Sequence, residues 1–301
     1  MDLKQIEYIL KIAEENNITR AAEKLFITQS ALNQQLLKLE KELDTPLFYR
    51  SRTNWRPTEA GEVYIRNAKE MLRIRKTTYD QIRDIARTQK GTLTLGITPG
   101  RGIALFGGVY PIFHQKYPYI TVEPVEQNVR TLQAMIAEGS LDVGFLTLGR
   151  QNYTKDEYIL LQEEEIVLSI PACHPLSQYA APPGEPLAVL DLKQAQYEPF
   201  VLMDRDSTMR VLINQIFERS GFTPSILFET KNHATIVSLI QSNLCCGLLP
   251  YYYIKTNPPG IASFRLPFHP TWDVVASHKK NAYVSEAARY FIELAREFWN
   301  S

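Results

Sequence analysis

The chain has 301 residues, no net formal charge, 45% hydrophobic and 22% charged residues, which is typical of a globular protein with several cores and not of a disordered chain. No apolar run approaches the roughly 20 residues that span a bilayer, and the N-terminus has no segment of signal-peptide type, so we expect a cytoplasmic protein without a membrane partner. The cysteines Cys173, Cys245 and Cys246 have neither disulfide nor metal-ligand spacing, which predicts buried reduced thiols and no metal site. We also expect no cofactor.

Three helices are predicted in the first 45 residues. Residues 2–15 carry apolar side chains at helical spacing, and Thr19 is the expected N-cap of a short helix over residues 20–25. Thr28 should cap a third helix over residues 29–42, in which four leucines would face inward: Leu32, Leu36, Leu39 and Leu43. Two helices joined by a turn of three or four residues form the helix-turn-helix arrangement.

A small hairpin and a long helix are expected next. Residues 47–58 contain two short extended pieces around a polar tip, with basic residues between them, which predicts a wing. Thr58 should cap a helix over about 59–88 with a pairing seam at heptad spacing, made by Tyr64, Ala68, Met71, Ile82 and Ile85. The alternative is a helix that packs only on its own domain.

The outward face of the third helix is polar and uncharged where a purely solvated helix usually carries Glu and Lys. Asn and Gln pair bidentately with adenine, Ser bonds several base edges, and Lys and Arg hold phosphates. The first 90 residues also contain 17 Lys and Arg and 13 Asp and Glu, which gives them a net charge of +4. The rest of the chain has a net charge of −4. The residues predicted to contact DNA are Thr28, Gln29, Ser30, Asn33, Gln34, Lys38, Arg50, Arg52, Arg56 and Thr58. The alternative is a three-helix module whose polar face only meets water.

Beyond residues 89–91 the pattern changes to alternating strands and helices. Strands are predicted at 92–97, 120–126, 141–147, 199–203, 226–229, 245–249 and 272–277, and helices at 103–116, 131–138, 208–220, 234–241 and 285–299. The β-α-β-α-β order predicts parallel sheets covered by helices, in two similar lobes joined by a chain crossover around residues 160–170. Two such lobes would enclose a cleft.

Residues 1–61 resemble the N-terminal domain of LysR-type transcriptional regulators. The resemblance is carried by Ala21 to Leu25, Thr28 to Leu32, Gln34 to Leu36, Leu39-Glu40, Leu43, Pro46 to Phe48, Arg50 and Pro57 to Gly61. It implies a winged helix-turn-helix domain at 1–58, a linker dimerisation helix at 59–90 and an effector-binding domain at 91–301. That domain would be of periplasmic-binding-protein-like α/β fold, with lobe I at about 91–162 and 266–301 and lobe II at about 163–265.

The same resemblance implies a bacterial, sequence-specific regulator that binds operator DNA as a dimer of dimers and responds to a small molecule, with RNA polymerase as a further candidate partner. In such lobes ligands lie at the carboxyl ends of strands, where helix N-termini direct N–H groups inward. The first strand ends at Thr98, Pro99, Gly100 and Arg101, and the resemblance adds Gln127, Asn128, Thr147, Met203, Asp204, Ser207, Thr208, His233 and Pro250. Arg101 and the helix ends favour an anionic or carboxylate effector.

Two other classes of function were weighed. A solute-binding component would explain residues 91–301 but not the N-terminal module. An enzyme could use Cys173 and His174 as nucleophile and base, but adjacent side chains on an extended chain point apart and no third orienting group can be named. Glu163, Glu164 and Glu165 are predicted to be an exposed charge run. We therefore expect no catalysis.

Overall fold

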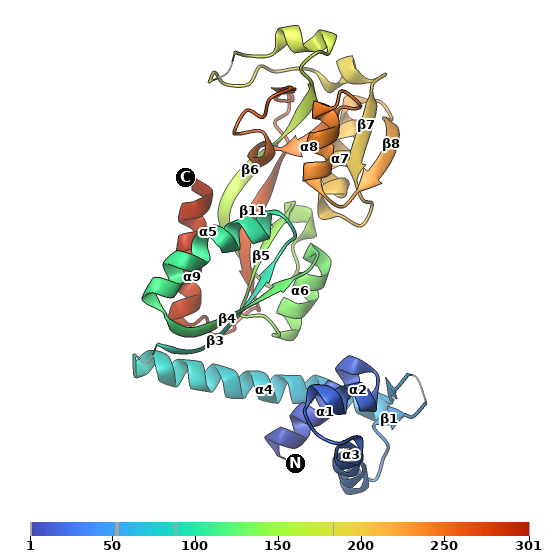
Figure 1. Cartoon of the computed structure of the whole chain (residues 1–301), viewed down its shortest axis with the longest axis vertical. Coiled ribbons are helices and arrows are strands. Elements are labelled where there is room, and N and C mark those ends of the chain that lie inside the picture. Colours follow the sequence, from blue (N-terminus) through green and yellow to red (C-terminus); the bar gives the residue numbers. More distant parts are fainter. Residues whose placement is uncertain (1, 52–53, 88, 183, 301) are drawn as a thin grey trace. The chain divides into compact units, whose positions relative to one another are not determined.

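The computed structural model describes residues 2–51, 54–87, 89–182 and 184–300. The chain divides into two units, one made of Met1–Thr88 with Glu138–Ser140 and the other of Gln89–Ala137 with Leu141–Ser301 (Figure 1). The predicted α/β fold with an N-terminal helix-turn-helix domain is confirmed. The finer division into 1–58, 59–90 and 91–301, and the bounds given for the two lobes, stay predictions.

The first unit begins with the predicted three helices and the wing. Its elements are α1 (Leu3–Glu15), α2 (Ile18–Lys24), α3 (Gln29–Leu43), β1 (Phe48–Tyr49), β2 (Arg56–Pro57) and α4 (Glu59–Ile85). Leu32, Leu36 and Leu39 of α3 are buried in one core with α1 and α2, because their spacing places them on a single helix face. Strands β1 and β2 pair antiparallel, which confirms the hairpin.

Two details of this unit correct the sequence predictions. Asn17, not Thr19, caps α2, because the Asn17 side chain accepts hydrogen bonds from the backbone N–H groups of Thr19 and Arg20. Leu43 is 44% exposed instead of facing inward. It is the last residue of α3, and the left-handed Asp44 that follows ends the helix there.

The second unit contains two α/β lobes, built on a seven-stranded sheet that both lobes share and a separate two-stranded sheet. Its strands are β3 (Lys90–Ile97), β4 (Tyr119–Glu126), β5 (Val143–Leu148), β6 (Glu157–Pro171), β7 (Pro199–Met203), β8 (Ser225–Thr230), β9 (Gly247–Pro250), β10 (Ile261–Phe264) and β11 (Thr271–His278). The α-helices are α5 (Arg101–Lys116), α6 (Val129–Glu138), α7 (Thr208–Ser220), α8 (His233–Gln241) and α9 (Glu286–Asn300). The short 3-10 helices are η1 (Arg150–Asn152), η2 (Pro175–Tyr179), η3 (Leu192–Ala195) and η4 (Tyr251–Tyr253).

The predicted parallel pairing is found between the strands of each β-α-β run, but the larger sheet is mixed, because further strands add antiparallel pairs. The strands follow the order β10–β6–β11–β5–β3–β4, and β9 also pairs with β6. The β3–β4, β3–β5 and β7–β8 pairs are parallel, whereas β11 runs antiparallel to both β5 and β6. The β10 strand was not predicted.

Strand β6 belongs to both lobes. Its first half pairs with β11, and its second half pairs with β9 and β10 (Figure 1). The register of the β6–β11 pair shifts once: Val274 lies opposite Gln162 but Val275 lies opposite Leu160, so Leu161 is an additional residue on β6. The predicted crossover near residues 160–170 is therefore made by one continuous strand, β6.

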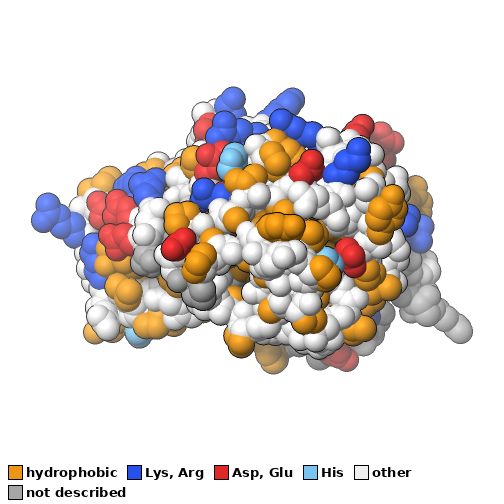
Figure 2. Space-filling view, turned by 90° about the horizontal axis from the view of Figure 1, so that it is seen from above, with side chains coloured by type: hydrophobic (Ala, Val, Ile, Leu, Met, Phe, Trp, Pro, Cys, Tyr) orange, Lys and Arg blue, Asp and Glu red, His pale blue; other side chains and the backbone are white. Residues whose placement is uncertain are grey.

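Each lobe has its own hydrophobic core. In the first lobe, α5 and α9 cover one face of the sheet and α6 covers the other, and in the second lobe α7 and α8 pack with β6, β7 and β9 (Figure 1). On the face of the molecule shown in Figure 2, hydrophobic side chains occur singly or in small groups among polar ones. Among the described residues, no helix combines the length and the apolar character that crossing a bilayer requires.

Candidate functional site

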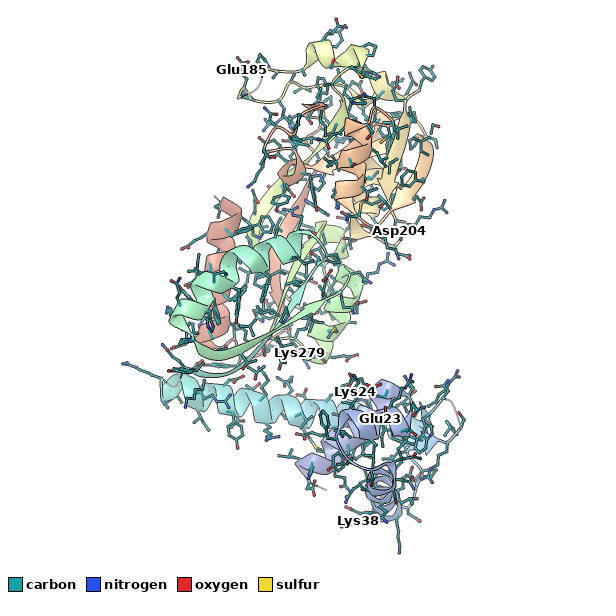
Figure 3. All side chains as sticks on the ribbon, in the orientation of Figure 1. Glu23, Lys24, Lys38, Glu185, Asp204 and Lys279 are labelled. Atoms are coloured by element: carbon teal, nitrogen blue, oxygen red, sulfur yellow. The ribbon has the colours of Figure 1, made fainter. Side chains whose placement is uncertain are left out.

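The outward side of α3 carries most of the predicted DNA-contacting residues in accessible positions. Thr28, Gln29, Ser30, Gln34 and Lys38 are exposed, and Asn33 is half-buried. Figure 3 shows Lys38 on the side of α3 that faces away from α1 and α2. The Thr28 hydroxyl accepts from the N–H of Ala31, and the Gln29 side chain accepts from the hydroxyl of Thr19 at 3.1 Å. This outward side of α3, with Thr28, Gln29, Ser30, Asn33, Gln34 and Lys38, is called the recognition face below. It is polar, accessible to solvent and held by hydrogen bonds at its N-terminal end.

The wing residues have more varied surroundings. Arg56 is exposed, and Arg52 lies outside the described residues. Arg50 forms an ion pair with the buried carboxylate of Glu40 and lies over the ring of Trp55, so part of its guanidinium fixes the hairpin to α3. A phosphate contact by Arg50 would use the part of its side chain that stays exposed.

Thr58 is buried, and its hydroxyl is already used on both sides. It donates to the carbonyl of Pro46 at 2.7 Å and accepts from the N–H of Gly61 at 3.0 Å, which caps α4. We therefore assign Thr58 to helix capping, behind the surface that is predicted to contact DNA.

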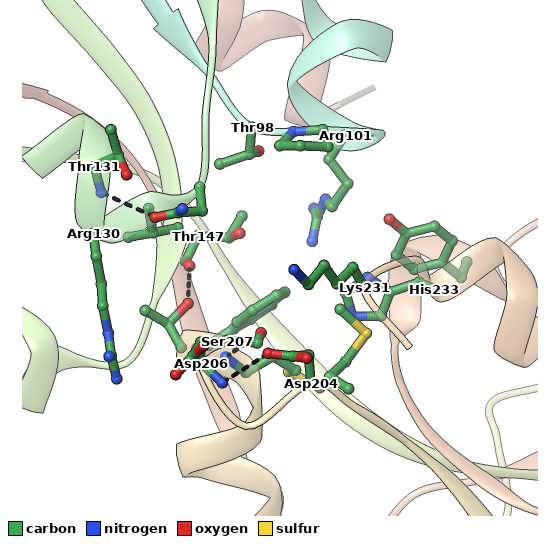
Figure 4. Close-up of a pocket in the computed structure, with 18 residues that line it drawn as sticks. Thr98, Arg101, Arg130, Thr131, Thr147, Asp204, Asp206, Ser207, Lys231 and His233 are labelled. Atoms are coloured by element: carbon green, nitrogen blue, oxygen red, sulfur yellow. Dashed lines mark hydrogen bonds between the residues drawn. The ribbon is translucent and has the colours of Figure 1, made fainter. Parts of the chain in front are cut away.

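A cavity of about 540 Å³ lies in the second unit, between the ends of strands from both lobes (Figure 4). Ten of the predicted effector-binding residues line it: Thr98, Pro99, Arg101, Asn128, Thr147, Met203, Asp204, Ser207, Thr208 and His233. The cavity is also lined by Val129, Arg130, Thr131, Asp206, Met209, Lys231, Tyr253 and Trp272. A volume of this size is typical of small-molecule sites.

Three predicted residues do not line the cavity. Gly100 is exposed at the N-cap of α5, Gln127 is exposed and its backbone N–H donates to Ile97, and Pro250 is buried opposite Ile166 in the sheet. Most of the residues that were missed stand within three positions of a predicted one, because they lie in the first turn of the same helix or in the loop just before it. Tyr253 and Trp272 carried no local signal, since only the fold brings them to the cavity.

Helix N-termini of both lobes meet at the cavity, and they are not equivalent. Asn128, Ser207 and Asn232 each accept a hydrogen bond from the first turn of α6, α7 and α8. Helix α5 begins at Gly100, which has a φ of +74° and no side chain to cap the helix. The N–H of Arg101, the first of α5, donates to the carbonyl of Pro99 at 3.0 Å, so the N–H groups that follow it in the first turn offer a place for an anion.

A buried ion pair of the second unit lies beside this helix end. Arg101 and Glu164 form an ion pair, and each side chain is 4% exposed. Glu164 also accepts from the backbone N–H of Tyr252 at 2.8 Å and from the indole N–H of Trp272 at 2.7 Å. The Arg101 guanidinium is 4.7 Å from the centroid of the Tyr252 ring and 4.6 Å from that of Trp299. Glu164 is thus a buried acceptor for three elements, which corrects its predicted place in an exposed charge run.

Arg101 keeps unused donors. Its Nε and Nη2 atoms are inaccessible to solvent and have no hydrogen-bond acceptor among the described residues. Figure 4 shows the Arg101 side chain directed into the cavity, with Lys231 reaching toward the same region from the other lobe. An isolated buried donor is costly, so these N–H groups are a candidate contact for a bound acceptor.

The aromatic wall of the cavity is electrically neutral. The His233 ring stacks on Tyr253 at 4.8 Å, and its Nε2 is inaccessible and unpartnered among the described residues. Burial, with a smaller contribution from the positive charge of Arg101, lowers the pKa of His233 to about 3. Burial raises the pKa of Tyr253 to about 12. Both side chains therefore stay uncharged at neutral pH.

The side chains considered for catalysis each contact other residues. Cys173 is exposed, which corrects the prediction that it is buried, and its thiol lies 3.1 Å from the side chain of Asn243. His174 accepts from the N–H of Leu176 and lies 3.2 Å from Glu198, so it serves a helix end and not the thiol. The described residues contain no group of three or more His, Cys, Asp or Glu side chains that could hold a metal ion.

Cys245 and Cys246 behave as predicted. Both are buried and free, and burial raises the pKa of Cys245 to about 11 and that of Cys246 to about 12. Both thiols are therefore kept protonated and unreactive at neutral pH.

Comparison with known proteins gives one consistent family. Residues 3–62 match the family described as "Bacterial regulatory helix-turn-helix protein, lysR family", and residues 86–300 match "LysR substrate binding domain". The uncharacterized HTH-type transcriptional regulator YcgK of Bacillus subtilis is 31% identical over 314 residues, which cover 99% of this chain and 94% of YcgK.

Two solved structures share the fold over nearly the whole chain. A full-length OxyR variant from Pseudomonas aeruginosa has a TM-score of 0.71 at 22% identity, covering 99% of this chain and 97% of that chain. Full-length CbnR complexed with its target DNA has a TM-score of 0.63 at 20% identity, covering 99% of each chain. At these identities the likeness concerns the fold.

Because the pKa of His233 is lowered in the folded chain, the free energy of unfolding should depend on pH. Between pH 6.5 and 3 the unfolded chain binds a proton at this residue that the folded chain does not, so the free energy of unfolding should fall as pH falls, by up to about 1.4 kcal/mol per pH unit. Urea unfolding of the wild type and of His233→Asn at pH 7, 6 and 5 measures this, and the variant should show the shallower pH dependence. Identical pH dependence in both proteins would contradict a neutral buried imidazole.

Proposed function

We propose which class of effector this chain binds, how it assembles and which of its residues contact the bases or the phosphates of DNA. The chain belongs to the LysR family of transcriptional regulators. The chain is a DNA-binding regulator and not an enzyme, and its C-terminal domain binds the effector. A bacterial origin and a cytoplasmic location belong to the same proposal, supported by the matched family of bacterial regulators and by the need to reach DNA.

In the proposed division of DNA contacts, the amides of α3 read bases and its lysine holds a phosphate. Gln29, Asn33 and Gln34 carry the amide groups that can pair with a base edge, whereas Lys38 can only neutralise charge. Exposure of this face along α3 supports the assignment, because a helix of this width fits the major groove with its N-terminal end leading.

The two kinds of contact should respond differently to substitution. Gln29→Ala or Asn33→Ala should relax base preference, because each removes a directional contact worth about 1–3 kcal/mol. Lys38→Gln should weaken binding to every duplex and reduce the slope of log K against log [salt] by about one, because one fewer counterion is released. Titrations of selected and random duplexes at several salt concentrations measure both effects. If the amide and lysine variants behave alike, the division is wrong.

We propose that the effector carries a carboxylate and that Arg101 receives it. Glu164 occupies only Nη1 of the guanidinium, so Nε and Nη2 remain. These two donors point along one edge and match the two oxygens of a planar carboxylate. The uncapped N-terminus of α5 and the Thr98 hydroxyl lie on the same side of the cavity and would complete the anion contact.

The rest of the cavity favours an organic acid over an inorganic anion. Buried apolar side chains line it from both lobes, among them Met203, Met209 and Trp272. Such walls stabilise the apolar body of a ligand by about 25 cal/mol for each Å² removed from water. Because the walls come from both lobes, a bound acid would also favour one relative orientation of the lobes, which is how an effector alters a regulator.

Thermal unfolding of the full chain with a panel of carboxylic acids, each compared with its neutral amide, tests the effector class. A binding acid at one hundred times its dissociation constant should stabilise the protein by about 2.7 kcal/mol, and its amide should stabilise it far less. Arg101→Lys should remove this preference, because lysine offers no paired edge. Thr98→Val should weaken it, and the control Thr223→Val, an exposed threonine outside the cavity, should not. Equal stabilisation by acid and amide would contradict the anionic class but not effector binding.

We propose that the chain assembles through α4. The first part of the predicted seam is used within the domain, where Ala68 is buried and Tyr64 packs on the core. Beyond it, Met71, Ile74 and Ile82 of α4 are 40–56% exposed. An exposed apolar helix face of this kind fits a second copy, and the family resemblance extends this to a dimer of dimers.

A charge placed in the exposed seam should disrupt this assembly. Ile82→Glu should lower the molar mass in solution, because two carboxylates would face each other across a helix pair. Gln81→Glu adds the same charge at the neighbouring exposed position and should leave the mass unchanged. Light scattering after size-exclusion chromatography measures the mass. If both variants keep the wild-type mass, α4 is not the pairing helix.

A further inference from the structure

Phe26 occupies a position that its own fold does not explain. It lies in the turn between α2 and α3 and is 95% exposed, the largest exposed fraction of any large apolar side chain among the described residues. Its φ is +55°, so it also adopts the left-handed conformation that L-residues with a side chain rarely take. Glu23 and Lys24, labelled in Figure 3, mark the end of α2 just before it.

The turn itself would favour a small residue at this place. Helix α2 ends at Leu25, and Phe26 is the next residue, where its N–H donates to Glu23 and the N–H of Ile27 donates to Ala22. This is the left-handed C-terminal turn in which glycine or asparagine is usually found. Phenylalanine at this position therefore destabilises the fold in two ways, through backbone strain and through apolar surface left in water. No contact among the described residues of the chain offsets either effect.

Phe26 lies close in the chain to the residues that are predicted to contact DNA. Two residues later Thr28 begins the exposed polar row that continues through Gln29 and Ser30 into α3. A side chain at this turn therefore stands at the N-terminal end of the recognition face, next to the residues assigned to the groove. The apolar surfaces of a duplex at such a point are deoxyribose rings and thymine methyl groups.

We propose that Phe26 is a DNA-contacting residue that packs against the apolar surface of the duplex at the edge of the groove entered by α3. This inference rests on the proposed placement of the α3 face on DNA and adds a contact that is neither charged nor hydrogen-bonded. Such a contact contributes affinity without releasing counterions.

Phe26→Gly separates folding from binding, because the two effects have opposite signs. Relief of the left-handed strain should leave the melting temperature unchanged or raise it. The same change should weaken binding to a duplex selected by the wild type from a random pool by about tenfold. The slope of log K against log [salt] should stay that of the wild type, in contrast to Lys38→Gln. Tyr197→Gly removes another aromatic side chain, 88% exposed in the second unit, and should leave DNA affinity unchanged.

A duplex with deoxyuridine in place of thymidine distinguishes the two apolar targets. If the effect of Phe26→Gly disappears on this duplex, the contact is to a thymine methyl, and if it persists, the contact is to deoxyribose. A stable Phe26→Gly protein that binds the selected duplex as tightly as the wild type would overturn the inference, whatever its effect on transcription. Absence of wild-type binding to any duplex would instead overturn the proposed placement of α3.

Discussion

The second unit depends on the buried carboxylate of Glu164. Its two oxygens accept hydrogen bonds from Arg101 on α5, from the N–H of Tyr252 in η4 and from the indole of Trp272 on β11. Breaking a buried ion pair by removing one partner typically costs 3–5 kcal/mol, because the remaining charge is left without compensation. One side chain on the strand shared by both lobes therefore fixes an element of each lobe, and the cavity lies directly beside it.

This arrangement also explains why Arg101 can serve structure and binding together. Rings of Tyr252 and Trp299 lie within 5 Å of its guanidinium carbon, and one nitrogen is held by Glu164. An arginine held in this way has lost its conformational freedom before any ligand arrives, so a ligand that meets its remaining edge avoids much of the ordering cost. A ligand on that edge would also act on Glu164, through the same guanidinium, and thereby on the elements that Glu164 holds.

Local patterns predicted most of the elements and much of the cavity. Helix caps, leucine spacing and strand ends depend on neighbours in sequence, so the cap at Thr28, the helix over 208–220 and the strand over 199–203 were predicted correctly. The role of Glu164 could not be predicted in this way, because its surroundings come from residues about 60 to 110 positions away. A run of three glutamates has the same sequence pattern whether its middle member faces water or a buried arginine.

The additional residue on β6 decides which of those glutamates is buried. Side chains on a strand alternate between faces, and Leu161 interrupts that alternation. Before Leu161, odd-numbered residues such as Ile159 face α5 and α9. After Leu161, the even-numbered Glu164 faces this side of the sheet, opposite Trp272. In an uninterrupted strand the parity would continue, presenting Glu163 and Glu165 to the guanidinium and turning Glu164 outward. A single inserted residue, without any charge of its own, thus selects the partner of Arg101.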